Sequence, residues 1–190
     1  TSGNNVVLRD SGALELGEST VSGTFGVTVG GALTQSGALS VTGVTTLVAG
    51  ANDVTLEDSG NNFGTVVVTS GNNVSVTDSG ALILGASSVS GTFGVTVGGA
   101  LTQSGALVVS GTTTIVADVN DVTLSNAGNN FGTVAITSGN NVVLRDSGAL
   151  ELGESTVSGT FGVTVGGALT QSGALVVSGT TTIVEIGRAH

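Results

Sequence analysis

The chain has 190 residues and a formal net charge of −10 at pH 7, and it contains 33 glycines but no Pro, Cys, Met, Trp or Tyr. Only 8% of its residues are charged, whereas 39% are hydrophobic. A disordered chain would be poor in Val, Leu and Ile, so this composition predicts a folded protein. Nucleic acid and anionic membrane surfaces are poor partners for it, since both require clustered Lys or Arg. No apolar run approaches the ~20 residues of a membrane-spanning helix, so we expect no membrane insertion.

Internal repeats organise the whole sequence. The hexapeptide TSGNNV begins at Thr1, Thr69 and Thr137, so one long segment recurs at a constant interval. The copies are close, since residues 1–39 are identical to residues 137–175. We therefore expect a single domain over residues 1–184, made of the repeats 1–68, 69–136 and 137–184.

Each repeat divides further into three units, which begin in the first repeat at Thr24, Val44 and Thr65. The third unit is the longest, because the next one begins only at Thr92. Every unit opens with a β-branched run that follows a glycine, and units of this kind bury an apolar face only by stacking. The pattern predicts an all-β fold, a parallel β-solenoid of about eight turns with three turns per repeat. At ~4.8 Å per turn, the rod would be on the order of 40 Å long.

Substitutions between the repeats indicate which side chains point inward. Val7, Arg9 and Glu15 become Ser75, Thr77 and Ile83, whereas the positions that alternate with them stay apolar. Such a period of two is typical of a strand with one buried face. Each Phe lies beside a unit boundary and is expected to fill a corner of the core, and the paired Asn residues are expected to form turns. The predicted core comprises Leu8, Leu14, Leu16, Val27, Val29, Leu33, Leu39, Leu56 and Phe63 with their equivalents in the next repeat, and the residues predicted to be exposed are Arg9, Glu15, Glu18 and Glu57.

The repeat texture resembles a known class of secreted protein. The stretch from Ser70 to Val134 reads SGNNVSVTDSGALILGASSVSGTFGVTVGGALTQSGALVVSGTTTIVADVNDVTLSNAGNNFGTV. It resembles the repeat region of bacterial filamentous haemagglutinin-like adhesins, which are secreted by two-partner or autotransporter routes. The resemblance covers residues 1–184 and implies a right-handed parallel β-helix that is extracellular or on the bacterial cell surface. The amino-terminal secretion domain of that family and an Arg-Gly-Asp triplet are not found in this sequence, so no binding residue is carried over.

The last six residues, EIGRAH, depart from the repeat pattern after Val184. They match the translation of six consecutive codons of a common sequencing adapter. We therefore expect residues 185–190 to be a non-native and dispensable tail in which residues 187–190 are exposed and frayed, and we exclude Arg188 and His190 from functional arguments.

Catalytic chemistry finds little support in the residue types. Nucleophilic catalysis requires a base near the nucleophile, and the chain has no Cys or Lys and no histidine outside the tail. The close carboxylate pairs are Glu15 with Glu18 and Glu151 with Glu154, but the second repeat replaces the pair by Ile83 and Ala86. We therefore expect no enzymatic activity, no catalytic residue and no cofactor.

Binding sites are the other possibility. Carboxylates at glycine turns could hold calcium, which needs six to eight oxygens, but they are also typical of turns in which Asp accepts backbone N–H bonds. Glycine-rich stretches such as VGGALTQSGAL lack the following Lys and the helix of a phosphate site. Thr runs at Val44, Thr112 and Thr180 could line an ice-binding face, although each unit carries a different Thr pattern. We expect no metal site, and the turn carboxylates concerned are Asp10, Asp53, Asp58, Asp78, Asp121 and Asp146.

The sequence thus favours a structural role. We expect a stiff shaft segment of a secreted bacterial adhesin, with an unknown receptor or surface as its partner. An ice- or glycan-binding face on a β-solenoid is the alternative, and a polysaccharide-acting enzyme comes third. Because a solenoid without caps exposes strand edges at both ends, we also expect concentration-dependent end-to-end self-association.

Overall fold

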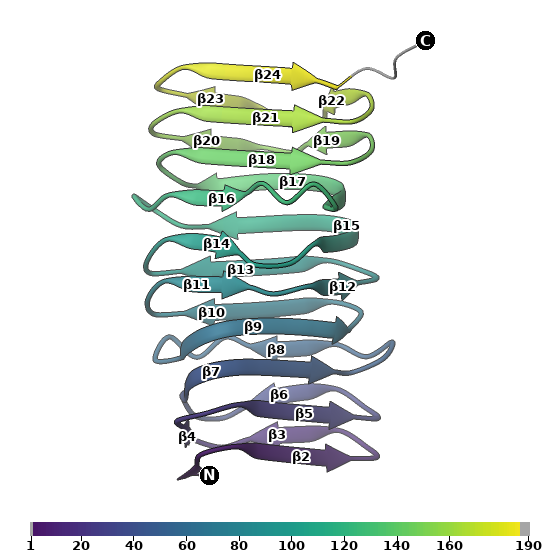
Figure 1. Cartoon of the computed structure of the whole chain (residues 1–190), viewed down its shortest axis with the longest axis vertical. Coiled ribbons are helices and arrows are strands. Elements are labelled where there is room, and N and C mark those ends of the chain that lie inside the picture. Colours follow the sequence, from purple (N-terminus) through teal and green to yellow (C-terminus); the bar gives the residue numbers. More distant parts are fainter. Residues whose placement is uncertain (1, 187–190) are drawn as a thin grey trace.

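The computed structural model describes residues 2–186, and this part of the chain consists of strands and turns without any helix. The strands stack into an elongated solenoid that rises from the N-terminus to the C-terminus (Figure 1). Every pairing between neighbouring strands is parallel. The predicted fold class, a parallel β-solenoid, is confirmed.

Two large sheets line opposite sides of the solenoid. The 12-stranded sheet, called sheet A, contains β1 (Ser2–Gly3), β2 (Val6–Asp10), β4 (Ser19–Val21), β5 (Phe25–Val29), β7 (Leu39–Val48), β9 (Asn62–Ser70), β11 (Leu82–Leu84), β14 (Leu101–Gln103), β16 (Val122–Leu124), β18 (Val142–Asp146), β21 (Phe161–Val165) and β24 (Thr181–Glu185). The 10-stranded sheet, called sheet B, contains β3 (Leu14–Leu16), β6 (Leu33–Gln35), β8 (Val54–Leu56), β10 (Val74–Asp78), β12 (Ser87–Val89), β13 (Phe93–Val97), β15 (Leu107–Val116), β17 (Asn130–Ser138), β19 (Leu150–Leu152) and β22 (Leu169–Gln171). A third, 2-stranded sheet pairs β20 (Ser155–Val157) with β23 (Leu175–Val177).

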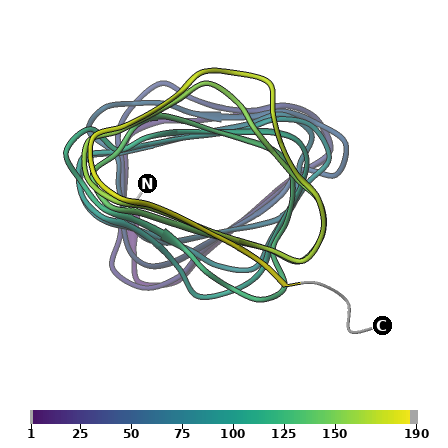
Figure 2. The same cartoon turned by 90° about the horizontal axis from the view of Figure 1, so that it is seen from above.

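The solenoid makes about nine turns. Seen along its axis, the turns follow one oval outline (Figure 2). The near strands of Figure 1 run to the right while the chain rises, so the solenoid is right-handed. At ~4.8 Å per turn its length is on the order of 40 Å.

The strand register shows how the repeat fits the turns. Seven pairings lead along sheet A from β2 through β5, β7, β9, β11, β14 and β16 to β18. These two end strands begin at Val6 and Val142, equivalent residues that lie two repeats apart. One repeat therefore makes three and a half turns, where its division into three units predicted three. The reason lies in the third and longest unit, because Thr65 already pairs with Ile83 and the turn closes well before the next unit begins at Thr92.

This half-turn offset moves equivalent segments to opposite sides of the rod. The first repeat places β2 in sheet A, whereas its equivalent β10 lies in sheet B and its second equivalent β18 returns to sheet A. The sequence therefore repeats on one face only once every seven turns.

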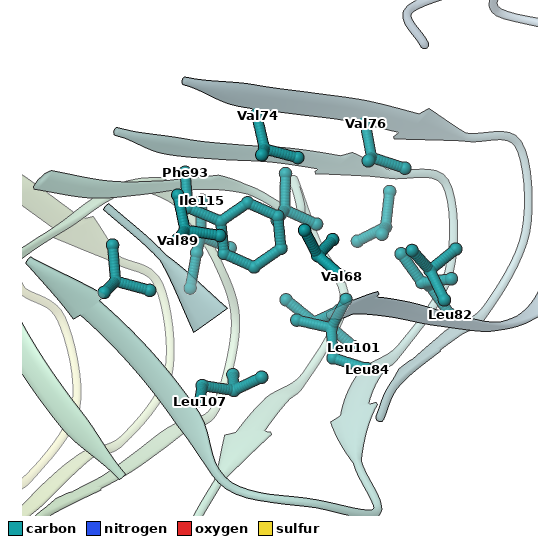
Figure 3. Close-up of a cluster of buried hydrophobic side chains, with 14 of the residues drawn as sticks. Val68, Val74, Val76, Leu82, Leu84, Val89, Phe93, Leu101, Leu107 and Ile115 are labelled. Atoms are coloured by element: carbon teal, nitrogen blue, oxygen red, sulfur yellow. The ribbon is translucent and has the colours of Figure 1, made fainter. Parts of the chain in front are cut away.

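Apolar side chains fill the interior. Leu82, Leu84, Phe93 and Leu101 point inward from both sheets and pack among valines of neighbouring turns (Figure 3). Predicted core residues Leu16, Val27, Val29, Leu33, Leu39, Leu56 and Phe63 are buried, and all five Phe side chains are at most 1% exposed. Arg9, Glu15, Glu18 and Glu57 are exposed, as predicted.

The ends of the stack differ from its middle. Leu8 and Leu14 are only half-buried because no described turn lies below them, whereas their equivalents Val76 and Leu82 are at most 1% exposed. At the other end β24 continues to Glu185, which pairs with Val165. The backbone N–H of the next residue, Ile186, also donates to the carbonyl of Val165 at 2.8 Å, so the ladder runs two residues past the point where the repeat pattern stops. The expected fraying of residues 187–190 lies outside the described part.

Two threonines occupy core positions without a polar partner. Thr45 and Thr113 are equivalent residues that are at most 1% exposed, and each pairs with a Phe in the turn below. Their hydroxyl oxygens have no hydrogen-bond partner within the described residues. A buried polar group without a partner lowers stability, so these hydroxyls weaken the core.

We predict that Thr113→Val raises the free energy of unfolding by about 1 kcal/mol, since Val fills the same space without an unpaired hydroxyl. Urea titration followed by circular dichroism measures the change. The half-buried neighbour Thr114 points outward and serves as control, where Thr114→Val should change stability by no more than about 0.5 kcal/mol. A Thr113→Val protein that is less stable than the unaltered chain would refute the assignment.

Candidate functional site

The glutamate pairs lie on the rod surface, where Glu154 lines a shallow depression of about 310 Å³ and its partner Glu151 does not. Glu15 lies on β3 and Glu151 on β19, both in sheet B, and seven turns separate them. The equivalent position in the second repeat, Ile83, lies in sheet A on the other side. The pair is thus repeated on one face at long intervals rather than concentrated at one place.

Two of the turn aspartates are part of the internal scaffold. Asp78 is 1% exposed, and its Oδ1 accepts the backbone N–H of Phe63 from the turn below at 2.6 Å, while its Oδ2 accepts the N–H of Gly80 at 3.0 Å. Asp146 makes the same two bonds with Phe131 and Gly148. Both carboxylate oxygens are therefore engaged by amides, which is the turn role rather than the calcium role. Burial raises the pKa of Asp78, although its bonds from Phe63 and Gly80 act in the opposite direction.

Asp53 and Asp121 form a second kind of contact between turns. Oδ1 of Asp53 accepts the backbone N–H of Asn73 at 3.0 Å and the side-chain amides of Asn72 and Asn73. Asp121 binds Asn140 and Asn141 in the same way. The backbone N–H bond, followed by the side-chain bonds, lowers the pKa of each carboxyl.

These lowered pKa values predict a pH dependence of stability. An Asp whose pKa falls on folding stabilises the native state above its unfolded pKa of about 3.9, and that contribution is lost as the pH falls through the folded value. Asp78 contributes in the opposite direction, because burial raises its pKa on folding, and the cost of burying its charge disappears when the carboxylate is protonated at low pH.

We predict that the double variant Asp53→Asn, Asp121→Asn, which keeps the accepting oxygens, loses less stability than the unaltered chain between about pH 5 and about pH 2. Urea titrations across that range measure it, and parallel curves for the two proteins would contradict the prediction.

A buried amide network was not foreseen from the sequence. Gln35 and Asn61 exchange two side-chain hydrogen bonds of 2.8 and 2.9 Å, although Asn61 lies one turn above Gln35, and Asn61 also accepts the backbone N–H of Leu39. Gln103 and Asn129 repeat the arrangement. Asn61 and Asn129 are 0% exposed, so they tie turns together besides shaping the loop. The one feature of the sequence that could have indicated this network is that Gln and Asn have the same separation along the chain in both repeats.

The Thr runs do not stack into rows. Thr46 lies between Gly26 below and Val67 above, and Thr114 lies between Gly94 and Ala135. These two equivalent threonines also belong to opposite sheets. The arrangement lacks the regular spacing that a continuous Thr array requires.

Surface depressions are shallow and open. One of about 360 Å³ is lined by Asp53, Asn73, Thr92 and Thr114 among others. Another depression is apolar and is lined by Val67, Ala86, Ala106 and Val108 among others. Ala86 stands where the first and third repeats have Glu18 and Glu154. Neither holds a group of titratable side chains that could perform acid–base chemistry.

Among residues 2–186, no three His, Cys, Asp or Glu side chains gather closely enough to hold a metal ion. Nor does this range contain a helix of the length and hydropathy that crosses a bilayer.

Comparisons with known proteins identify the repeats but give them no activity. A family model described as repeats of unknown function (DUF5649) matches residues 3–70, 71–138 and 139–189. Its first two matches have the same period as the recurring hexapeptide TSGNNV. No curated protein and no solved structure matches the chain. Nothing in these findings connects the repeats with haemagglutinin-like adhesins.

Proposed function

We propose that this chain, which belongs to the family of repeats of unknown function (DUF5649), is a stiff, non-enzymatic shaft segment of a secreted bacterial cell-surface adhesin. The observation that carries the proposal is the continuity of the stack. One core cluster extends from Leu16 to Val165, and backbone ladders join every turn to the next. A load along the axis is thus resisted by parallel backbone bonds and by the contiguous core.

The side-chain contacts between turns support a mechanical role. Asp78, Asp53 and Asn61 each bind a residue of a neighbouring turn, and their equivalents Asp146, Asp121 and Asn129 do so again in the next repeat. Polar residues that a binding protein would direct at a ligand are here directed along the rod.

The alternative functions have less support. A repetitive ice- or glycan-binding face requires the same side chains at short intervals on one side, whereas the half-turn offset sends equivalent residues to opposite sheets. All five aromatic side chains are buried and so offer no stacking platform to a sugar ring. A polysaccharide-acting enzyme would need paired carboxylates in a groove.

Two measurements test the proposal. In single-molecule pulling through the two termini, a shaft keeps its folded length until it ruptures at high force, whereas gradual extension at low force would contradict stiffness. Antibodies raised against the chain should label intact bacteria that carry the sequence. Labelling that requires permeabilised cells would overturn the surface location while leaving the mechanical result intact.

A further inference from the structure

One face of the rod carries apolar side chains in a stretch without charges. The strands β7, β9, β11, β14 and β16 follow one another in sheet A (Figure 1), and none of them contains Asp, Glu, Lys or Arg. Outward-facing apolar residues gather on and beside these strands, and we call them the apolar patch: Val44, Val67, Ile83, Ala86, Ala106 and Val108. Val44, Ile83 and Val108 are between 38% and 41% exposed. A contiguous exposed apolar surface is typical of an interaction site.

The strand register joins these side chains into one surface. Val44 pairs with Thr65, and Thr65 pairs with Ile83 in the turn above. The other four residues of the apolar patch line one shallow depression of about 510 Å³. The patch therefore covers four consecutive turns, those of β7, β9, β11 and β14, and it lies away from both ends of the stack.

The chain also contains equivalents of this surface that are acidic. Glu151 stands one repeat after Ile83, and Glu154 stands one repeat after Ala86. The half-turn offset places Glu151 in sheet B, and Glu154 lines the equivalent depression there. The first repeat has glutamates at the same two positions, and its Glu15 lies in sheet B as well. The described part of the rod is therefore apolar on one side at this position of the repeat and acidic on the other.

We propose that the apolar patch is a docking surface for the same patch of a second copy of this chain, so that two rods associate side by side through sheet A. Each rod has one such patch, so the contact is isologous and closes at a dimer. The chain carries a net charge of −10, which makes two copies repel each other. That repulsion is least where the two contacting faces are built from uncharged strands.

A second rod matches this face in spacing and in size. The outward side chains repeat at ~4.8 Å from turn to turn, and another stack of parallel strands has the same period. The uncharged strands cover about 20 Å along the axis, and about seven residues of each turn span about 23 Å across it. The contact then buries on the order of 1,000 Å² in total, the lower limit of specific interfaces. We expect a dissociation constant on the order of 10–100 μM. This association does not depend on the adhesin role, because it involves one face of the rod only.

Sedimentation equilibrium of the full chain tests the proposal. A monomer–dimer equilibrium is expected that gains dimer at high salt, because salt screens the repulsion between two acidic rods. Small-angle X-ray scattering gives the geometry, since a side-by-side dimer is thicker than the monomer but equally long, whereas end-to-end association lengthens the rod. The double variant Ile83→Glu, Ala86→Glu should weaken the dimer at least about 100-fold, because like charges then meet across the contact.

The chain supplies a matched control for this variant. The altered rod should fold, since the first and third repeats carry glutamate at both positions, and circular dichroism checks it. Thr55→Glu, Thr96→Glu adds the same two charges at exposed positions of sheet B. This control should change the dissociation constant by no more than about three-fold, because its charges lie outside the contact.

A converse variant copies the apolar patch into sheet B, by Thr112→Val, Ala135→Val, Glu151→Ile and Glu154→Ala together. A rod with one patch on each side can bind two neighbours, so lateral assemblies larger than a dimer are expected. The proposal is overturned if the unaltered chain stays monomeric up to about 1 mM. It is also overturned if association only lengthens the rod, if both glutamate variants weaken the dimer equally, or if the converse variant forms nothing larger than a dimer.

Discussion

Leu82→Asp is expected to destabilise the rod by about 4 kcal/mol or more, because it places an unpaired carboxylate in the core. Leu82 is 0% exposed on β11 and pairs with Leu101 in the next turn, where Figure 3 shows both side chains among other apolar groups. A loss of this size is a large part of the roughly 5–15 kcal/mol that typically holds a domain together. The expected readout is an early transition in urea or heat, since each turn contacts only its neighbours and the rod can open at its middle.

Ile83→Asp is the matched control. Ile83 follows Leu82 directly but points outward and is 39% exposed, so the same charge meets solvent. Its expected cost is about 1 kcal/mol, which reflects the poor strand propensity of Asp. Equal melting curves for the two variants would show that the inward face of β11 is wrongly assigned.

Gly166→Ala should cost about 3 kcal/mol for a different reason, the close approach of two backbones. A Cβ at Gly166 would lie 2.2 Å from the carbonyl oxygen of Ser147 in the turn below. The atom met is backbone, which cannot rotate away, so the turns must separate locally. The equivalent Gly30 and Gly98 show the same contact at 2.2 and 2.3 Å.

Gly162→Ala tests whether this effect is steric or a general cost of replacing glycine. Gly162 lies on β21, the strand that ends just before Gly166. The nearest atom to a Cβ at Gly162 would be the carbonyl oxygen of Val142, at 3.9 Å. With room available, the substitution is expected to be neutral or to stabilise by about 0.5 kcal/mol, since Ala restricts the unfolded chain. Chemical denaturation of the two variants gives the comparison, and similar losses for both would contradict the steric explanation.

The stacked fold could be predicted from the sequence because its signals are local. Strict alternation identified inward residues such as Leu82 and outward residues such as Glu15, and repeated units required neighbours to bury them. The turn count per repeat could not be predicted in this way. Phe93 in SGTFGVTV pairs with Val74 in the preceding turn, and only this register shows that the longest unit of the repeat exceeds one turn.

In the candidate sites, too, local features could be predicted from the sequence, whereas contacts between turns could not. Reading Asp78 as a turn residue was correct in type, but its bond to Phe63 joins residues of different turns, which a local motif cannot reveal. Asn61 was expected in a turn and proved to be fully buried as well, because Gln35 satisfies its amide. The burial of the unpaired Thr113 hydroxyl could not be predicted, because the run of three threonines from Thr112 is typical of an exposed strand.

Engineered cysteines can test the half-turn offset, because the chain has no cysteine of its own. Ile83 pairs with Thr102 in the structure, and both side chains point outward. Paired residues on adjacent strands lie about 4.8 Å apart, within the range that a disulfide spans. If each repeat made three whole turns, Ser75 rather than Ile83 would lie beside Thr102. We predict that the double variant Ile83→Cys, Thr102→Cys forms an internal disulfide on mild oxidation, as measured by loss of free thiols in a monomer. The pair Ser75→Cys, Thr102→Cys should remain reduced, and the opposite outcome would contradict the offset.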